Sequence, residues 1–235
     1  MKSPLLPALT TCLVLFALIT TKPWVVEADN SQVLDTDGNP VRWNRYYYIL
    51  PIVIRHIPWN GGLSLGWIAP NRCQLFVIQL RSGDGLPVKL APLTSRLPVV
   101  TTSSDLYFKF GTNDHQECRL PLVWNLLRSA SRLWFLRANG PTIPNPNTLQ
   151  GVNSVFRIEP YGLNSYKIVF CPENFDVPTM CKGIGMYFSG NQLSLRDDTE
   201  PVRFVFKRVN VNSSDSSEPA FDVLNSSDNI INFRL

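Results

Sequence analysis

Histidine is scarce in this sequence, and so are charged residues. The 235 residues include two histidines, His56 and His115, and no Gly-x-Ser-x-Gly motif accompanies them. Charged residues make up 17% of the chain, the formal net charge is +4, and the basic residues are scattered rather than clustered. A nucleophilic active site needs a base beside its nucleophile, and a nucleic-acid surface needs clustered cations. We therefore expect neither an enzyme nor a nucleic-acid-binding protein, and no cofactor.

Long amphipathic helices are also missing, because no stretch sustains the i, i+3, i+4 spacing of apolar residues. Short β-branched and aromatic runs separated by Gly, Pro and Asn turns fill the chain instead. Runs such as Tyr166–Phe170 alternate apolar and polar residues, as a strand with one buried face does. This pattern predicts an all-β barrel or sandwich of about a dozen strands. The expected strands are 46–54, 63–67, 73–80, 106–110, 120–124, 133–136, 154–159, 166–170, 185–188, 192–195 and 202–209.

The first 28 residues have the features of a secretory signal. Lys2 precedes an apolar run from Leu5 to Ile19, and Val26 and Ala28 supply small residues before a cleavage site. The apolar run is short for a bilayer span, so we expect cleavage rather than membrane anchoring. The mature protein is then expected outside the cell or in the vacuole, with no membrane association.

The remaining chain divides into a domain at 29–210 and a polar tail at 211–235. The tail is rich in Asn, Ser and Asp, which is typical of solvated and mobile chain. It contains two Asn-x-Ser sequences, and we expect N-glycosylation at Asn212 and Asn225.

No Cys-x-x-Cys pair is present, which disfavours a zinc site. Four cysteines remain after removal of the signal segment, and an even number in a secreted chain indicates two disulfides with three possible pairings. The short separation of Cys171 and Cys181 favours a local bridge, which leaves Cys73 to pair with Cys118.

One segment in the middle of the chain, Leu90–Thr102, combines prolines near both ends with a single cation, Arg96. It lies between two strand-like runs, 74–80 and 106–110. Our hypothesis is that a disulfide-linked β-scaffold displays this segment to a protease.

A family resemblance extends this hypothesis. The sequence Val-Leu-Asp-Thr-Asp-Gly-Asn-Pro-Val at 33–41, followed by Tyr-Tyr-Ile-Leu at 47–50, resembles the N-terminal signature of the Kunitz soybean trypsin inhibitor family of plants. The resemblance covers about 33–209. Further blocks that resemble the family in the same order are 71–73, 103–106, 146–149, 156–159 and 166–172.

The resemblance implies a β-trefoil, in which twelve strands form a six-stranded barrel and a cap. It also implies the disulfides Cys73–Cys118 and Cys171–Cys181, and a monomer. No three-fold repeat is visible in the residues themselves. The family's usual activity is inhibition of serine proteases through a substrate-like loop between the fourth and fifth strands.

The resemblance implies a position for the reactive bond, which is found by counting residues from two landmarks of the family pattern. Counted back from Phe110, the P1 residue, whose side chain fills the specificity pocket of the protease, is Arg96; counted forward from Cys73, it is Leu97. The block at 103–106 favours the first count, so we assign the bond to Arg96–Leu97. The remaining expected loop residues are Thr94, Ser95 and Pro98.

Two departures from the family pattern weaken this assignment. Pro98 has no N–H where a substrate-like loop donates one to the enzyme. The asparagine that braces the loop in well-known members corresponds by spacing to Trp43, with Asn44 beside it as a possible substitute.

Two hypotheses therefore remain. The first is an inhibitor of serine proteases, with a trypsin-like endopeptidase as partner because of Arg96. The second is a miraculin-like binding or storage protein of the same fold, which has no serine-protease inhibition or acts on a cysteine protease, an aspartic protease or a carbohydrase through another surface.

Overall fold

The computed structural model describes ten segments of the chain, and all structural statements concern them: 31–52, 59–68, 71–94, 97–111, 118–129, 133–145, 147–171, 181–187, 191–195 and 200–210. The expected signal segment 1–28 and tail 211–235 lie outside them, with both predicted glycosylation sites, Asn212 and Asn225. Ser95 and Arg96 also lie outside the described residues.

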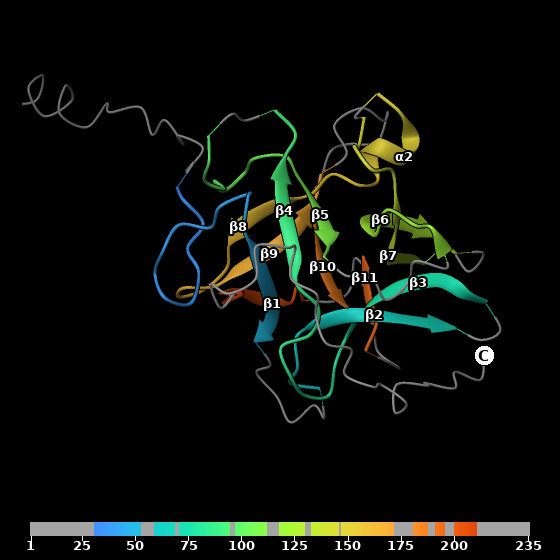
Figure 1. The fold of residues 1–235 in the computed structure, drawn as a ribbon, viewed down its shortest axis with the longest axis horizontal. Coiled ribbons are helices and arrows are strands. Elements are labelled where there is room, and N and C mark those ends of the chain that lie inside the picture. Colours follow the sequence, from blue (N-terminus) through green and yellow to red (C-terminus); the bar gives the residue numbers. More distant parts are fainter. Residues whose placement is uncertain are drawn as a thin grey trace, which may run out of the picture.

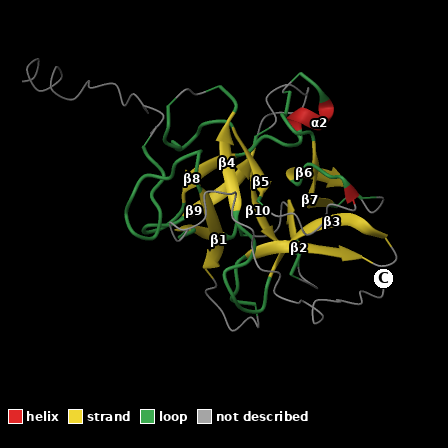
Figure 2. Ribbon diagram, viewed as in Figure 1, coloured by secondary structure: helices red, strands yellow, loops and turns green. Residues whose placement is uncertain are grey.

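Twelve strands of the described residues form one continuous sheet, and a short α-helical turn accompanies them (Figure 2). The strands are β1 (Tyr46–Ile52), β2 (Leu63–Ile68), β3 (Asn71–Gln79), β4 (Val88–Pro92), β5 (Leu106–Phe110), β6 (Val123–Arg128), β7 (Trp134–Gly140), β8 (Arg157–Pro160), β9 (Tyr166–Phe170), β10 (Lys182–Met186), β11 (Leu193–Leu195) and β12 (Arg203–Arg208). The helical turn α2 (Leu149–Val152) lies between β7 and β8. No helix in these segments has the length and hydrophobicity needed to cross a bilayer.

Six strands close into a barrel in the order β1, β4, β5, β8, β9 and β12 (Figure 1). All the pairings are antiparallel. The contact that joins β5 to β8 is a bridge between Leu106 and Phe156, with backbone hydrogen bonds in both directions of 2.8 and 2.9 Å. Because β1 pairs with both β4 and β12, the ring has no free edge within this set of strands.

The other six strands form a cap of three antiparallel pairs, β2–β3, β6–β7 and β10–β11. The pairs meet one another through Phe76 and Arg137, through the β7–β11 pairing, and through a bridge between Ile78 and Gln192. The chain therefore repeats one unit three times: a barrel strand, a cap pair and a second barrel strand. This is the expected β-trefoil, and its repeat lies in the pairing pattern.

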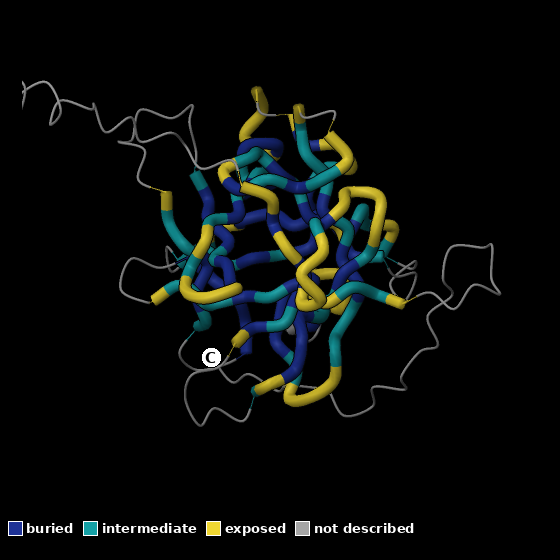
Figure 3. The backbone as a smooth tube through the Cα atoms, turned by 90° about the vertical axis from the view of Figure 1, so that its left-hand side faces the viewer, coloured by how far each residue is buried: buried dark blue, intermediate teal, exposed yellow. Residues whose placement is uncertain are grey.

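Aromatic and aliphatic side chains fill the core of the barrel. In Figure 3 the buried residues lie mainly in the interior of the backbone trace, and the exposed residues lie mainly on its outer loops. The rings of Phe108 and Trp124 stack with centroids 4.6 Å apart, and Phe156 meets each of them edge-on. All three are fully buried. A single core of this kind fixes the positions of the loops that leave the barrel.

The structure corrects several expected boundaries. The sequence prediction omitted β4, so the loop that follows it begins at Leu93 rather than Leu90. Val88 and Leu90 are buried on either side of the half-buried Lys89, but prolines at both ends of this short strand hid the alternation. Strand β6 begins at 123 rather than 120, and β10 at 182 rather than 185.

Candidate functional site

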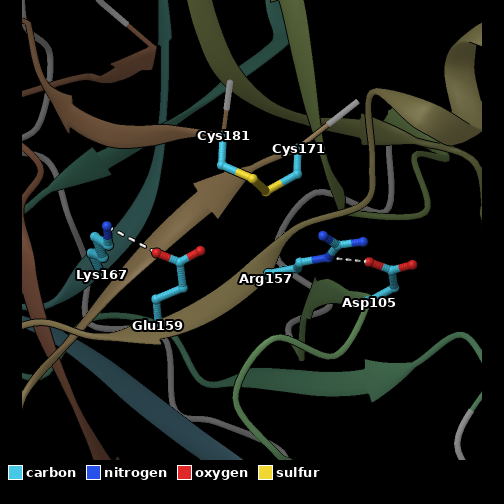
Figure 4. The surroundings of a disulfide bond; sticks show 6 residues. All are labelled: Asp105, Arg157, Glu159, Lys167, Cys171 and Cys181. Atoms are coloured by element: carbon cyan, nitrogen blue, oxygen red, sulfur yellow. Dashed lines mark hydrogen bonds and ion pairs between the residues drawn. A yellow bond between two sulfur atoms is a disulfide. The ribbon is translucent and has the colours of Figure 1, made fainter. Parts of the chain in front are cut away.

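The loop between β4 and β5, residues 93–105, is closed firmly at its base. The Leu93 amide donates to the Asp105 carbonyl at 3.0 Å, directly beyond the last β4–β5 pair. The Asp105 carboxylate accepts from Nε of Arg157 at 2.7 Å (Figure 4). Because Arg157 begins β8, this ion pair joins the end of the loop to the next barrel strand.

The downstream arm of the loop, residues 97–105, packs against the N-terminal hairpin, residues 31–43. The two segments meet through a closed triangle of backbone hydrogen bonds among three valines. Val33 donates to Val100 at 2.9 Å, Val100 to Val41 at 2.8 Å, and Val41 to Val33 at 2.7 Å. All three side chains are fully buried. This valine triangle satisfies the N–H and C=O of each residue and holds the arm in place.

Further contacts extend the attachment on both sides of the valine triangle. The Trp43 amide donates to the Pro98 carbonyl at 3.3 Å, and the Thr102 amide donates to the Ser31 carbonyl at 2.8 Å. Farther along the arm, the side-chain hydroxyls of Thr101 and Ser104 hydrogen-bond to each other. The arm is therefore held along most of its length by the chain's own N-terminal segment.

Tyr47 lies beneath the N-terminal hairpin and supports it from β1. Its hydroxyl accepts the Arg42 amide at 2.9 Å, and Arg42 forms an antiparallel bridge with Val99 of the downstream arm. Burial raises the pKa of the Tyr47 hydroxyl above its ordinary value, and the Arg42 N–H bond opposes that rise only in part. The tyrosine is therefore neutral at physiological pH.

The predicted loop residues that the structure describes all lie at the surface. Thr94, Leu97 and Pro98 are exposed, and the Leu97 side chain is 56% accessible. These residues flank the assigned Arg96–Leu97 bond on both sides. The residues next to that bond therefore face solvent, and farther along the downstream arm the chain turns inward at the buried Val100.

The two predicted support residues contribute unequally. Trp43 contacts the loop through its backbone amide, while its side chain is 40% exposed. Asn44 is exposed, and within the described part of the chain no hydrogen bond joins it to the loop. Sequence reasoning missed the support that Val33, Val41 and Val100 provide. The sequence feature that could have indicated this support is the pair Val33 and Val41, one on each side of an Asp-Gly turn. In that turn the Asp35 carboxylate accepts the amides of residues 37 and 39.

Both expected disulfides are present. Cys73 in β3 bonds to Cys118 ahead of β6, and Cys171 at the end of β9 bonds to Cys181 ahead of β10 (Figure 4). Glu159 lies near the second bridge, and the three potential ligand atoms lie within 4.8 Å of one another. The two sulfurs are bonded to each other and offer no thiolate to a metal ion. Glu159 instead pairs with Lys167 at 2.9 Å.

Comparison with known sequences places this chain in context. The family model of the legume Kunitz type, described as trypsin and protease inhibitor, matches residues 33–208. A 21 kDa seed protein of Theobroma cacao is 33% identical over 212 residues, which are 86% of this chain and 93% of the relative. Miraculin of Synsepalum dulcificum is 30% identical over 80% of this chain and 88% of its own length. Kunitz trypsin inhibitor 4 of Arabidopsis thaliana is 27% identical over 76% of this chain and 83% of its own.

Comparison with solved structures finds the same fold. The Kunitz-type cysteine protease inhibitor PCPI-3 from potato superimposes with a TM-score of 0.63 at 25% identity. The match covers 78% of this chain and all of the potato protein. The similar proteins thus include inhibitors named for trypsin and for cysteine proteases. They also include miraculin and the 21 kDa seed protein, whose names mention no protease.

Proposed function

The chain belongs to the plant Kunitz family of trypsin and protease inhibitors, and on that premise we propose that it inhibits trypsin-like serine proteases through the loop 93–105. In this proposal Arg96 is the P1 residue and Arg96–Leu97 is the reactive bond. Because this is a family of protease inhibitors, its match also confirms the expectation that the protein is not an enzyme.

The observation that carries the proposal is the attachment of the downstream arm. A loop held in its bound shape loses little conformational entropy when an enzyme binds it. The arm from Pro98 to Thr102 is held by backbone hydrogen bonds that do not involve the reactive bond. If a protease cleaves Arg96–Leu97, the new amino end therefore stays near the acyl group, and the reverse reaction competes with hydrolysis.

The chemistry of Arg96 sets the preferred enzyme class. A trypsin-like specificity pocket contains a buried carboxylate, to which a guanidinium gives a strong charge-assisted pairing. A bulky aliphatic residue such as Leu97 at the same position would favour a chymotrypsin-like pocket instead. Inhibition of trypsin would therefore support Arg96 as the P1 residue, whereas inhibition of chymotrypsin would support Leu97.

A second candidate function is favoured by one observation on Pro98. Proline offers no N–H to an enzyme, and the Pro98 carbonyl already accepts the Trp43 amide. At this position the N–H that a protease strand would accept from is missing, and the carbonyl that it would donate to already accepts a hydrogen bond within the protein. A protein with this loop could retain the fold and bind through another surface, as a non-inhibitory member or an inhibitor of cysteine proteases.

The test is titration of bovine trypsin, chymotrypsin and papain with the purified mature protein, alongside Arg96→Ala. We expect trypsin inhibition in the micromolar range or tighter, and its loss in Arg96→Ala. Arg81→Ala, which removes an exposed arginine ahead of β4, is the matched control and should inhibit like the wild type. Absence of inhibition of trypsin and chymotrypsin by the wild type would refute the serine-protease proposal. Trypsin inhibition that survives Arg96→Ala would refute only the assigned bond.

Proteins of this family are typically secretory. We extend the proposal to removal of residues 1–28, delivery to the extracellular space or vacuole, and glycosylation at Asn212 and Asn225. Mass spectrometry of the protein from its native tissue, before and after enzymatic deglycosylation, tests these points. An N-terminus at Met1, or no mass change on deglycosylation, would contradict the corresponding part.

A further inference from the structure

The outer wall of the barrel carries lysine and tyrosine side chains on four neighbouring strands. The strands β12, β1, β4 and β5 pair in that order, and alternate residues of each strand belong to the buried core. The residues between them therefore point outward. Six of these outward residues, which we call the lysine–tyrosine wall, are Tyr46, Tyr48, Lys89, Tyr107, Lys109 and Lys207.

The strand register shows that the lysine–tyrosine wall is one contiguous surface. Lys89 lies opposite Tyr46 on one side and opposite Lys109 on the other, so a row of three side chains crosses β1, β4 and β5. These three strands lie side by side in Figure 1. The Lys89 Nζ lies 5.9 Å from the centroid of the Tyr46 ring. On the other side of β1, Tyr48 lies opposite Lys207.

Two of the lysines face each other across the sheet. Cross-strand partners have Cβ atoms about 5 Å apart, and like charges in such a pair destabilise a sheet. Among the described residues neither Lys89 nor Lys109 has a carboxylate partner, whereas Lys207 pairs with Asp84 at 2.6 Å. Lys109 is exposed and Lys89 is half-buried. The fold therefore keeps two adjacent positive charges that a bound anion would neutralise.

The composition of the wall indicates which kind of anion fits it. Three lysines fall short of the larger cation clusters that bind nucleic acids and anionic membranes. None of the three cations is an arginine, the residue whose planar fork pairs with phosphate. Tyrosine joins an apolar ring to a polar hydroxyl, which suits the C–H face and the hydroxyls of a sugar. A chain of uronate sugars, with one carboxylate on each sugar, matches both the lysines and the tyrosines.

We propose that the lysine–tyrosine wall binds an acidic polysaccharide, a chain of uronate sugars, along the row that crosses β1, β4 and β5. Lys89 and Lys109 bind carboxylates of the chain, and Tyr46 and Tyr107 contact the faces of its sugar rings. Because the outward side chains of a sheet stand on a fixed backbone, the polymer meets a surface that is already formed.

This wall is separate from the loop 93–105. Three residue steps along the β4–β5 pair lie between Lys89–Lys109 and Pro92–Leu106, the last pair before the loop, which is about 10 Å. Polysaccharide binding therefore does not depend on the proposed protease inhibition, and Arg96→Ala should leave it unchanged. Loss of polysaccharide binding in Arg96→Ala would overturn the assignment to the wall, because the polymer would then be held at the loop.

The experiment measures binding of the purified mature protein to immobilised polygalacturonate by biolayer interferometry. We expect the wild type to bind, and to bind more weakly as salt screens the charges. Lys89→Gln/Lys109→Gln should weaken binding by about tenfold or more. The matched control is Arg72→Gln/Arg119→Gln, which removes two exposed cations outside the wall and should change binding less than about twofold. No binding by the wild type at low salt, or equal losses in the two double variants, would overturn the proposal.

Comparison polymers separate the contribution of charge from that of the sugar rings. Methyl-esterified polygalacturonate has the rings without the charges, and poly(L-glutamate) has the charges without the rings, so both should bind more weakly than polygalacturonate. Tyr107→Ser should weaken polygalacturonate binding by about threefold and leave poly(L-glutamate) binding unchanged. Equal binding of poly(L-glutamate) would show that charge alone is recognised, and tighter binding of double-stranded DNA would show a nucleic acid as the occupant. Either result would overturn the proposal.

A charge reversal keeps the test independent of misfolding. Lys109→Glu replaces the like-charge pair with an ion pair between Glu and Lys89, so the midpoint of urea unfolding at low salt should rise. The same change places a negative charge under the polymer and should weaken polygalacturonate binding by more than about tenfold. A more stable variant that binds less cannot have lost binding through unfolding. Wild-type affinity in Lys109→Glu would overturn the proposal.

Discussion

The two arms of the loop 93–105 differ in how they are attached to the rest of the protein. The upstream arm continues from β4, and among its described residues the base contact is the Leu93 amide on Asp105. The downstream arm forms four backbone hydrogen bonds with the N-terminal hairpin, through Pro98, Thr102 and both backbone groups of Val100. The downstream arm thus depends on chain that lies far away in sequence. The N-terminal hairpin, residues 31–43, is therefore part of the candidate site.

The largest expected effect comes from breaking the downstream attachment itself. Val100→Asp places an unpaired carboxylate in the buried valine triangle and should lower the free energy of unfolding by about 4 to 5 kcal/mol. Urea unfolding measures this loss. Val99→Asp is the matched control, because Val99 is adjacent and only half-buried, and it should cost less than about 1 kcal/mol. Equal losses in the two variants would show that the valine triangle contributes nothing specific.

Removing a disulfide should separate global stability from the attachment of the arm. Cys73→Ser/Cys118→Ser opens a bridge with a sequence separation of 45, and the chain-entropy model gives a loss of about 4 kcal/mol. Cys171→Ser/Cys181→Ser, with a separation of 10, should cost about 2.7 kcal/mol. The four bonded cysteines all lie outside the loop 93–105, so protease inhibition below the melting temperature should be unchanged. An inhibition constant that rises as stability falls would contradict this separation.

Tyr47 tests the support beneath the N-terminal hairpin. Tyr47→Phe leaves the Arg42 amide without its partner and should cost about 1.5 kcal/mol. The raised pKa of Tyr47 means that folding favours the neutral hydroxyl. Its contribution to stability is therefore complete below the unfolded pKa of about 10 and is lost as pH rises through the higher folded value.

Unfolding measured from pH 8 to pH 11 checks this sign. The wild type should lose stability above about pH 10, and Tyr47→Phe should lose less over the same interval. Tyr48, whose pKa burial also raises, remains in both proteins and supplies the residual slope. Identical slopes would mean that Tyr47 does not titrate with unfolding.

The smallest expected effect concerns the base of the downstream arm. Arg157→Ala removes the ion pair with Asp105 and should cost about 1 kcal/mol, because both side chains are partly solvated. Lys167→Ala is the matched control. It removes a similar ion pair, between Lys167 of β9 and Glu159 of β8, and should lower the free energy of unfolding by about 1 kcal/mol as well. Only Arg157→Ala should weaken protease inhibition. Equal inhibition by both variants would show that this ion pair does not position the loop.

Much of the fold was predictable from local pattern, because a strand with one buried face repeats every two residues. Tyr166–Phe170 shows this alternation and forms β9 as expected. Strand β4 was missed because its five residues are flanked by prolines and carry too few alternations to stand out. The three-fold arrangement resides in the pairing of strands, and equivalent strands need share no residue type.

The candidate site was less predictable than the fold. The loop could be located from its proline ends and from the resemblance, but its attachment could not. The valine triangle joins residues 33, 41 and 100 through main-chain atoms, and main-chain hydrogen bonds leave little trace in side-chain identity. The expectation of an asparagine brace looked for a side chain, whereas the observed contact from Trp43 is a backbone amide.

The valine triangle also has a consequence for how such a protein diversifies. Its three bonds join only peptide groups, so mutations at the neighbouring positions 94–98, of which 94, 97 and 98 are described as exposed, can accumulate without loosening the loop. Target preference can then drift among descendants of one gene at almost no cost to the fold. The same property makes this segment suitable for transplantation, in which a foreign recognition peptide replaces 94–98 and inherits a ready-made constraint on its downstream end.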